Sequence, residues 1–253
     1  MGVGFIHIHY SLTIGEEVEM TNMQSTSTSS GSFFQTWVDA LTKPREQTYA
    51  AIAASPKAKA TTGYIWILVS SIVTSIVTFV AQGAQIQQQL QSSGVDLGQA
   101  GGGLGSLAVT ILCGAPIAAI VGVLFFAIWV AIVQWIARMF GGKGTNDQLA
   151  YTLAAIAAPY SLISAIFVLF ALIPYVGFCF NAILGLGGLY ILVLQIMALK
   201  AVNRFGWGPA IASYAIPGLA VLLVCCVATA IVVTLSGAVL GDVFSTINQS
   251  LMQ

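Results

Sequence analysis

The stretch FGGKGTNDQL, residues Phe140 to Leu149, has the residue types that come closest to a ligand-binding loop. Glycines around a lysine, followed by a threonine, are typical of a loop that cradles nucleotide phosphates. A P-loop needs GxxxxGK followed directly by Ser or Thr, between a strand and a helix. Here Gly144 separates Lys143 from Thr145, and the preceding WIARMF ends an apolar helical run. We therefore expect neither a nucleotide nor any other cofactor at this loop.

The same residues fit a turn between two helices. Gly141 and Gly142 are placed to end the preceding helix, as glycine often does at a helix C-terminus. Thr145 or Asn146 can cap the following helix, and Asp147 is favourable in its first turn.

Other reactive side chains form no recognisable catalytic or metal site. His7 and His9 alternate in FIHIHY, and two histidines alone make a poor metal site. No GxSxG motif or triad is present. The cysteines lie in apolar runs without CxxC spacing, so we expect apolar fillers in helix packing: Cys113, Cys179, Cys225 and Cys226.

The composition defines the class of protein. Only 6% of the 253 residues are charged, and the mean hydropathy is +0.93. An average soluble domain carries about a quarter charged residues, so this chain cannot cover a soluble surface. Eight basic and eight acidic residues give zero net charge, and no basic excess points to nucleic acid. The sequence predicts an integral membrane protein.

A membrane-crossing helix needs about 20 apolar residues. Apolar runs of that length predict an all-α, five-span helical bundle within residues 61–245, followed by a tail at 246–253. Pro174, in the stretch IPYVG, divides the longest uncharged run into two spans. The predicted spans are approximately 63–80, 112–135, 150–172, 176–199 and 214–235.

The positions of the charges agree with five spans. All eight basic residues fall on one side of the predicted bundle: Lys43, Arg45, Lys57, Lys59, Arg138, Lys143, Lys200 and Arg204. The other side carries Asp96 and Asp242 and no basic residue. By the positive-inside rule, this predicts a cytoplasmic N-terminus and a C-terminus outside.

Two segments precede the first span. Residues 11–32 are acidic and then rich in Ser and Thr, which predicts a disordered tail over residues 1–32. Translation could also start at Met20 or Met23. Residues 33–60 predict two short helices at the membrane interface, separated at Pro44. Apolar residues recur on one face of the first: Phe33, Phe34, Trp37, Val38 and Leu41. This segment either anchors the first span or docks a partner.

No Asp, Glu, Lys, Arg or His lies within the predicted spans, which argues against a proton-coupled transporter. The strong polar groups are Gln134, Asn181 and Gln195. Asn181 is the best single candidate for a functional polar group, although an interhelical hydrogen bond is the more ordinary expectation. Gly114, Ala118 and Gly122 repeat every four residues and favour close helix packing, within the bundle or between copies of it.

Several blocks in order resemble prokaryotic members of the Yip1 family of membrane proteins. These are FFQTWVDALTKPREQTY, GGKGTNDQLAYTLAAIAAPY, IPYVG and LQIMALKAVNRFGWGPAIASYAIP, and the resemblance covers Phe33 to the C-terminus. It implies a five-span bundle with a cytoplasmic N-terminus, in a prokaryotic cytoplasmic membrane. Eukaryotic relatives are linked to Rab-type GTPases and vesicle traffic. They carry a DLYGP-like motif that this chain lacks, so GTPase binding is not implied.

The leading hypothesis is a non-enzymatic protein that organises partners or lipid in the membrane. Its expected partners are the bilayer and other membrane proteins or copies of itself. The candidate interaction surface comprises Phe33, Phe34, Trp37, Leu41, Lys43, Pro44, Arg45 and Lys143. The alternative is a permease or channel for a small uncharged solute, with helix breaks at Pro116 and Pro159 and with Asn181 in its lining. An enzyme would need a site made of loop residues alone.

Overall fold

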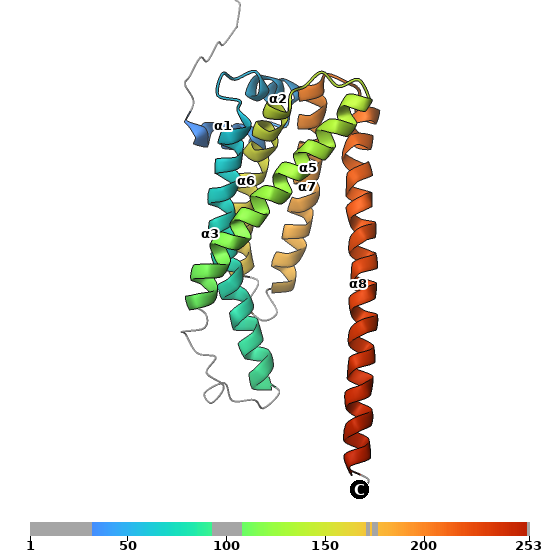
Figure 1. Cartoon of the computed structure of the whole chain (residues 1–253). Coiled ribbons are helices and arrows are strands. Elements are labelled where there is room, and N and C mark those ends of the chain that lie inside the picture. The colour runs from blue at the N-terminus through green and yellow to red at the C-terminus, as the bar shows by residue number, and fades with distance from the viewer. Residues whose placement is uncertain (1–31, 93–107, 171–172, 174–176, 252–253) are drawn as a thin grey trace, which may run out of the picture. The chain divides into compact units, whose positions relative to one another are not determined.

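The structure, a computed structural model, describes residues 32–92, 108–170, 173 and 177–251. Within these ranges the chain is helical and contains no strand. The elements are α1 (Phe33–Thr42), α2 (Glu46–Ala53), α3 (Ala60–Ser92), the π-helical turn η1 (Thr110–Gly114), α5 (Ala115–Met139), α6 (Asn146–Phe170), α7 (Gly177–Asn203) and α8 (Trp207–Leu251) (Figure 1).

Five of the described helices are long and apolar enough to cross a membrane, which confirms the predicted fold class. The spanning stretches are Ala60–Ile86, Ile111–Met139, Asn146–Phe170, Gly177–Asn203 and Trp207–Thr234. The helices run past the predicted spans. At its C-terminal end, α3 continues past the predicted span through a glutamine-rich stretch to Ser92. Alanine and glutamine favour a helix whether or not lipid surrounds it, so the polar stretch limits the apolar span without ending the helix.

The prolines interrupt the spans less than expected. Pro159 lies inside α6, which remains one helix, and Pro116 lies in the first turn of α5, where no intrahelical partner for its nitrogen is required. The predicted hairpin at Pro174 lies outside the described residues, as do Asp96 and the tail with His7 and His9.

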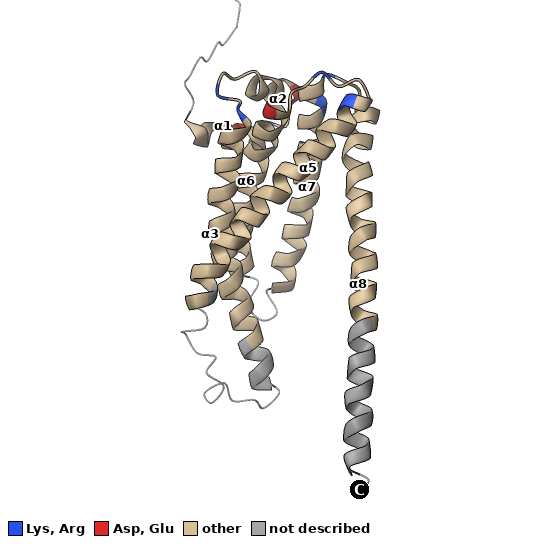
Figure 2. Ribbon diagram, viewed as in Figure 1, with Lys and Arg blue, Asp and Glu red and all other residues tan. Residues whose placement is uncertain are grey.

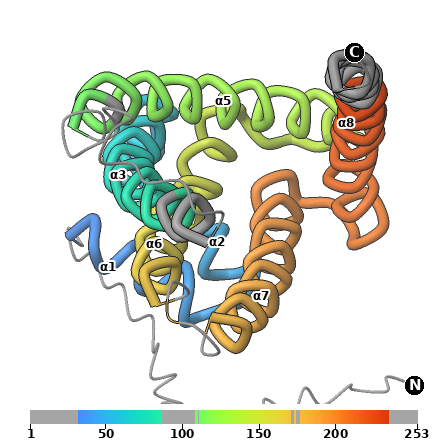
Figure 3. Tube along the Cα trace, turned by 90° about the horizontal axis from the view of Figure 1, so that it is seen from below, coloured from blue at the N-terminus to red at the C-terminus, as the bar shows by residue number. Residues whose placement is uncertain are grey.

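Small residues allow the helices to approach closely. Helix α3 packs along both α6 and α5, α6 also packs on α7, and α8 contacts α5 and α7 (Figures 1 and 3). A Cβ atom on Gly63 of α3 would lie 3.0 Å from the carbonyl oxygen of Ala150 in α6. A Cβ on Gly122 of α5 would lie 3.4 Å from the hydroxyl of Ser71 in α3. Gly122 therefore serves packing within the bundle.

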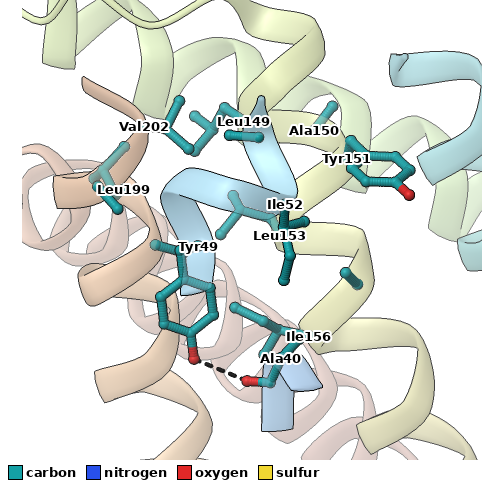
Figure 4. Packing of buried hydrophobic residues seen from close by; sticks show 14 of the residues in the cluster. Ala40, Tyr49, Ile52, Leu149, Ala150, Tyr151, Leu153, Ile156, Leu199 and Val202 are labelled. Atoms are coloured by element: carbon teal, nitrogen blue, oxygen red, sulfur yellow. Dashed lines mark hydrogen bonds between the residues drawn. The ribbon is translucent and has the colours of Figure 1, made fainter. Parts of the chain in front are cut away.

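The best-buried side chains gather where α2 meets α6 and α7 (Figure 4). Tyr49 of α2 is completely buried, and Ile52 is nearly so. They pack into a cluster with side chains of α6 and α7, among them Leu149, Leu153, Ile156, Leu194 and Leu199. Away from this cluster many large apolar side chains are exposed, as expected of helices that face lipid.

The expected role of the cysteines in helix packing is wrong. All four, Cys113, Cys179, Cys225 and Cys226, are free and exposed on the outside of the helices. A small apolar thiol is compatible with a lipid-facing position as well as with a packed one. Sequence alone does not show which face of an all-apolar helix turns inward.

Candidate interaction surface at the charged end

The Lys and Arg residues of the described chain lie at one end of the helical bundle, which we call the charged end (Figure 2). It consists of α1, α2, the α5–α6 loop and the α7–α8 loop (Figures 1 and 2). The buried cluster around Tyr49 lies at the same end. The best-packed part of the described chain therefore supports the surface that carries the Lys and Arg residues.

The α5–α6 loop is an ordered turn, as the sequence predicted. Gly141 has a positive φ of 84°, a conformation that favours glycine. Its N–H donates to Arg138, and the N–H of Gly142 donates to Ala137, which together form a Schellman motif. Thr145 then begins α6 as a capping box. Its N–H donates to Gln148 Oε1, and its hydroxyl accepts from the N–H of Gln148.

A buried amide network fixes this loop to the end of α7. Asn203 is fully buried, and its Oδ1 accepts hydrogen bonds from Gln134 Nε2 at 3.0 Å and from the N–H of Gly144 at 3.2 Å. Its Nδ2 donates to Gln134 Oε1 and to the carbonyl of Leu199. Gln134 Nε2 also donates to the carbonyl of Gly144. In a P-loop, backbone N–H groups of the loop point toward phosphate. Here the N–H of Gly144 donates to Asn203 instead.

Two glycines let the loop reach Asn203. A Cβ on Gly142 would lie 2.5 Å from Asn203 Oδ1 and 2.8 Å from the carbonyl oxygen of Ala137. A Cβ on Gly144 would lie 2.7 Å from Val202 Cγ1 and 2.9 Å from Asn203 Oδ1. The glycines therefore provide room for the network at these two positions.

We predict that Gly144→Ala destabilises the bundle by about 2 kcal/mol, because its Cβ cannot enter without displacing Asn203. Gly208→Ala in α8 is the matched control, because nothing lies within 4 Å of a Cβ there. The control should be neutral or slightly stabilising, since alanine favours a helix over glycine by about 1 kcal/mol. Thermal unfolding of the purified variants in one detergent measures both effects. Equal melting temperatures for the Gly144→Ala and Gly208→Ala variants would contradict the close approach of Gly144 to Asn203.

The α1–α2 hairpin, residues 33–53, is attached to the bundle by polar contacts as well as by packing. The Tyr49 hydroxyl donates to the carbonyl of Ala40 at 2.8 Å, which closes the hairpin (Figure 4). The Tyr190 hydroxyl of α7 donates to the carbonyl of Leu41 at 2.7 Å. Lys200 of α7 forms an ion pair with Glu46. The hairpin is therefore fixed to α7 at both of its helices.

Burial raises the pKa of the Tyr49 phenol, and the neighbouring Tyr190 adds to the shift. The phenol therefore remains protonated and able to donate to Ala40. Because the folded pKa lies above the ordinary value of about 10, this contribution to stability is complete below that pH. It is lost as the pH rises from there through the folded pKa.

The predicted apolar face of α1 is divided between the bundle and the exterior. Trp37 stacks edge-to-face on Trp66 of α3, with ring centroids 5.7 Å apart, and Leu41 packs against the buried cluster. Phe33 and Phe34 remain 59% and 62% exposed. One side of α1 holds the hairpin in place, and an aromatic edge remains available for lipid or a partner.

The polar candidates of this segment lie on the same hairpin. Lys43 pairs with Asp39 at 2.8 Å, Pro44 is exposed between the helices, and Arg45 is exposed at the start of α2. Lys143 is instead part of the α5–α6 loop, where its N–H donates to the carbonyl of Asn203. The structure therefore brings seven of the eight predicted surface residues together and places Lys143 on a separate loop.

The intramembrane candidates differ in their surroundings. Asn181 is exposed and donates to the carbonyl of Gly177 in its own helix, at 2.9 Å, so the expected interhelical bond is not the one it makes. Gln195 accepts a hydrogen bond from the Tyr214 hydroxyl, which joins α7 to α8. Gly114, the last residue of η1, and Ala118 of α5 are half-buried, whereas the buried positions of α5 include Ala115 and Ala119.

Sequence reasoning missed Asn203, the centre of the buried network. Gln134 was recognised as a strong polar group within a span, and Asn203 lies 69 residues away in the sequence. A signal was present, because the glycine-rich loop lacks side chains at the positions where a close backbone approach needs room. The sequence did not indicate which residue approaches it.

Five apolar helices with the Lys and Arg residues of the described chain at one end define a polytopic helical membrane protein. The model of the Yip1 domain matches residues 38–229, which is most of the chain. The protein belongs to the Yip1 family. Searches of curated proteins and of solved structures returned no match.

Proposed function

We propose that this protein is a non-enzymatic Yip1-type membrane protein that gathers partner proteins at the bilayer surface through its α1–α2 hairpin. The observation that carries the proposal is the combination of a firmly attached hairpin with an exposed aromatic edge. Tyr49 and Tyr190 fix the hairpin, while Phe33 and Phe34 stay about 60% exposed. A preorganised surface binds at a lower entropic cost than a flexible segment.

We infer the orientation in the membrane from the basic residues. Their position at one end supports a cytoplasmic charged end and N-terminus, with the C-terminus outside. The resemblance to prokaryotic Yip1 proteins supports a prokaryotic cytoplasmic membrane as the location. The hairpin would then face cytoplasmic partners.

The structure favours partner binding over the permease alternative. Asn181, the proposed lining residue, is exposed and bonded within its own helix. The amides of Gln134 and Asn203 are buried, but they bond to each other and to the α5–α6 loop. Among the described residues, neither group lines a path between helices.

A photo-crosslinking residue at Phe34 tests the proposal in native membranes. We expect discrete protein adducts from this position. The same photo-crosslinking amino acid in place of Phe125 of α5, whose side chain is 69% exposed, should give lipid adducts alone. Adding Tyr49→Ala should abolish the protein adducts, because it releases the hairpin. Lipid adducts alone from Phe34 would show that α1 is only an anchor.

A further inference from the structure

The α5–α6 loop (residues 140–145) and the α7–α8 loop (residues 204–206) form one surface, which we call the double loop. The Lys143 N–H donates to the carbonyl of Asn203 at 3.2 Å, and the Gly144 N–H donates to Asn203 Oδ1 at the same distance. The buried side chain of Gln134 donates from Nε2 to the carbonyl of Gly144 and to Asn203 Oδ1, and so bonds to both partners of the second contact. Side chains on the double loop are therefore held by a rigid base.

Lys143 and Arg204 are exposed cations on the double loop, and Arg138, in the last turn of α5, is an exposed cation next to it in the chain. Within the part of the chain that the structure describes, none of the three forms an ion pair, whereas Lys200 pairs with Glu46. The neighbouring carboxylate is Asp147, exposed in the first turn of α6. Three cations against one carboxylate leave an excess of positive charge.

Arg204 occupies a position that favours another residue type. Its φ is 54°, and its N–H donates to the carbonyl of Lys200, which makes it the left-handed residue that ends α7. Glycine or asparagine is the usual choice there, because other side chains are strained in this conformation. Arginine at this position costs local stability and supplies a charge.

Aromatic side chains place the double loop at headgroup depth. Trp135 of α5 is 65% exposed and Trp207 of α8 is 47% exposed, on the helices that lead into and out of the two loops. Exposed tryptophans mark the membrane–water interface, where lipid phosphates also lie. The cations beside them therefore meet the headgroup layer.

We propose that the double loop binds the phosphate of an anionic phospholipid in the leaflet at the charged end, through Arg138, Lys143 and Arg204. Guanidinium and ammonium groups are the usual partners of lipid phosphates, and a basic residue near an anionic membrane surface contributes about fivefold to binding. This site is separate from the α1–α2 hairpin, so it stands whether or not the hairpin binds a protein.

The test uses the full-length protein in a neutral detergent, with short-chain phosphatidylglycerol as the probe. Bound lipid raises the melting temperature by an amount that grows with the logarithm of the ratio of lipid concentration to Kd, so a titration gives an apparent Kd. The variant Lys143→Gln/Arg204→Asn should bind phosphatidylglycerol on the order of tenfold more weakly. Its melting temperature without lipid should be unchanged or higher, because asparagine adopts the left-handed conformation more easily.

The matched control is Lys57→Gln/Lys59→Gln, which removes two exposed cations before α3. It should change the Kd less than about threefold. Equal losses in both variants would overturn the proposal, since binding would then reflect surface charge in general. Phosphatidylcholine binding as tightly as phosphatidylglycerol, or inorganic phosphate binding as tightly as either, would also overturn it.

Discussion

Asn203→Leu is expected to destabilise the bundle by about 3 kcal/mol, the largest effect of any single polar substitution at the charged end. The side chain is fully buried and makes hydrogen bonds to Gln134, Gly144 and Leu199. Leucine would leave the Gly144 N–H and Gln134 Oε1 buried without the partners that Asn203 supplies, and each carries a desolvation cost of about 1 to 3 kcal/mol. Thermal unfolding in detergent should show a drop of roughly 10 °C.

The control for this substitution is Asn181→Leu, the same change on the same helix. Asn181 is exposed and bonds within its own helix, so its replacement should shift the melting temperature by no more than about 2 °C. The pair therefore separates the buried network from the general effect of replacing an amide in α7. Similar shifts for both variants would mean that the network contributes little.

A second variant measures the coupling. Gln134→Leu alone should be destabilising. The double variant Gln134→Leu/Asn203→Leu should lose less stability than the sum of the losses in the two single variants. Removing both amides takes away two partners of the same hydrogen bonds and substitutes apolar contact. Additive losses would show that the two amides act independently.

The five helices were predictable because apolar length depends only on local composition. The turn after α5 was predictable for the same reason, since Gly141 and Thr145 act on their own neighbours. The role of Asn203 was not predictable, because its partner Gln134 lies 69 residues away in the sequence. A polar residue at the end of a helix is also common, so its residue type alone carried no signal. Contacts between distant segments depend on how the helices are arranged, which hydropathy does not specify.

The amphipathic pattern of α1 correctly predicted a helix, but only part of its apolar face is an exposed surface. Five apolar residues were placed on one face, and the bundle takes Trp37 and Leu41 from it while leaving Phe33 and Phe34 exposed. A periodicity identifies the apolar side of a helix without indicating how much of that side a neighbour covers. That division is what makes the hairpin a candidate surface.

Tyr49→Ala is expected to detach the α1–α2 hairpin while α3 to α8 stay folded. Tyr49 is completely buried, and the loss of such an aromatic ring costs about 3 to 5 kcal/mol. The cost falls mainly on the hairpin, because the Tyr49 hydroxyl also closes it through the carbonyl of Ala40. Hydrogen exchange of the α2 amides should become on the order of a hundredfold faster, and exchange in α6 should change far less.

Two controls separate the ring from its hydroxyl and from aromatic loss in general. Tyr49→Phe keeps the ring and removes one hydrogen bond, which is worth about 1 kcal/mol, so exchange should accelerate only about fivefold. Tyr64→Ala removes a half-buried ring from α3, where it packs on Phe126, and should leave the α2 amides protected. If Tyr49→Ala left α2 as protected as in the unaltered protein, the ring would not be what holds the hairpin. The ion pair between Lys200 and Glu46 and the hydrogen bond from Tyr190 to Leu41 would then have to hold the hairpin in place.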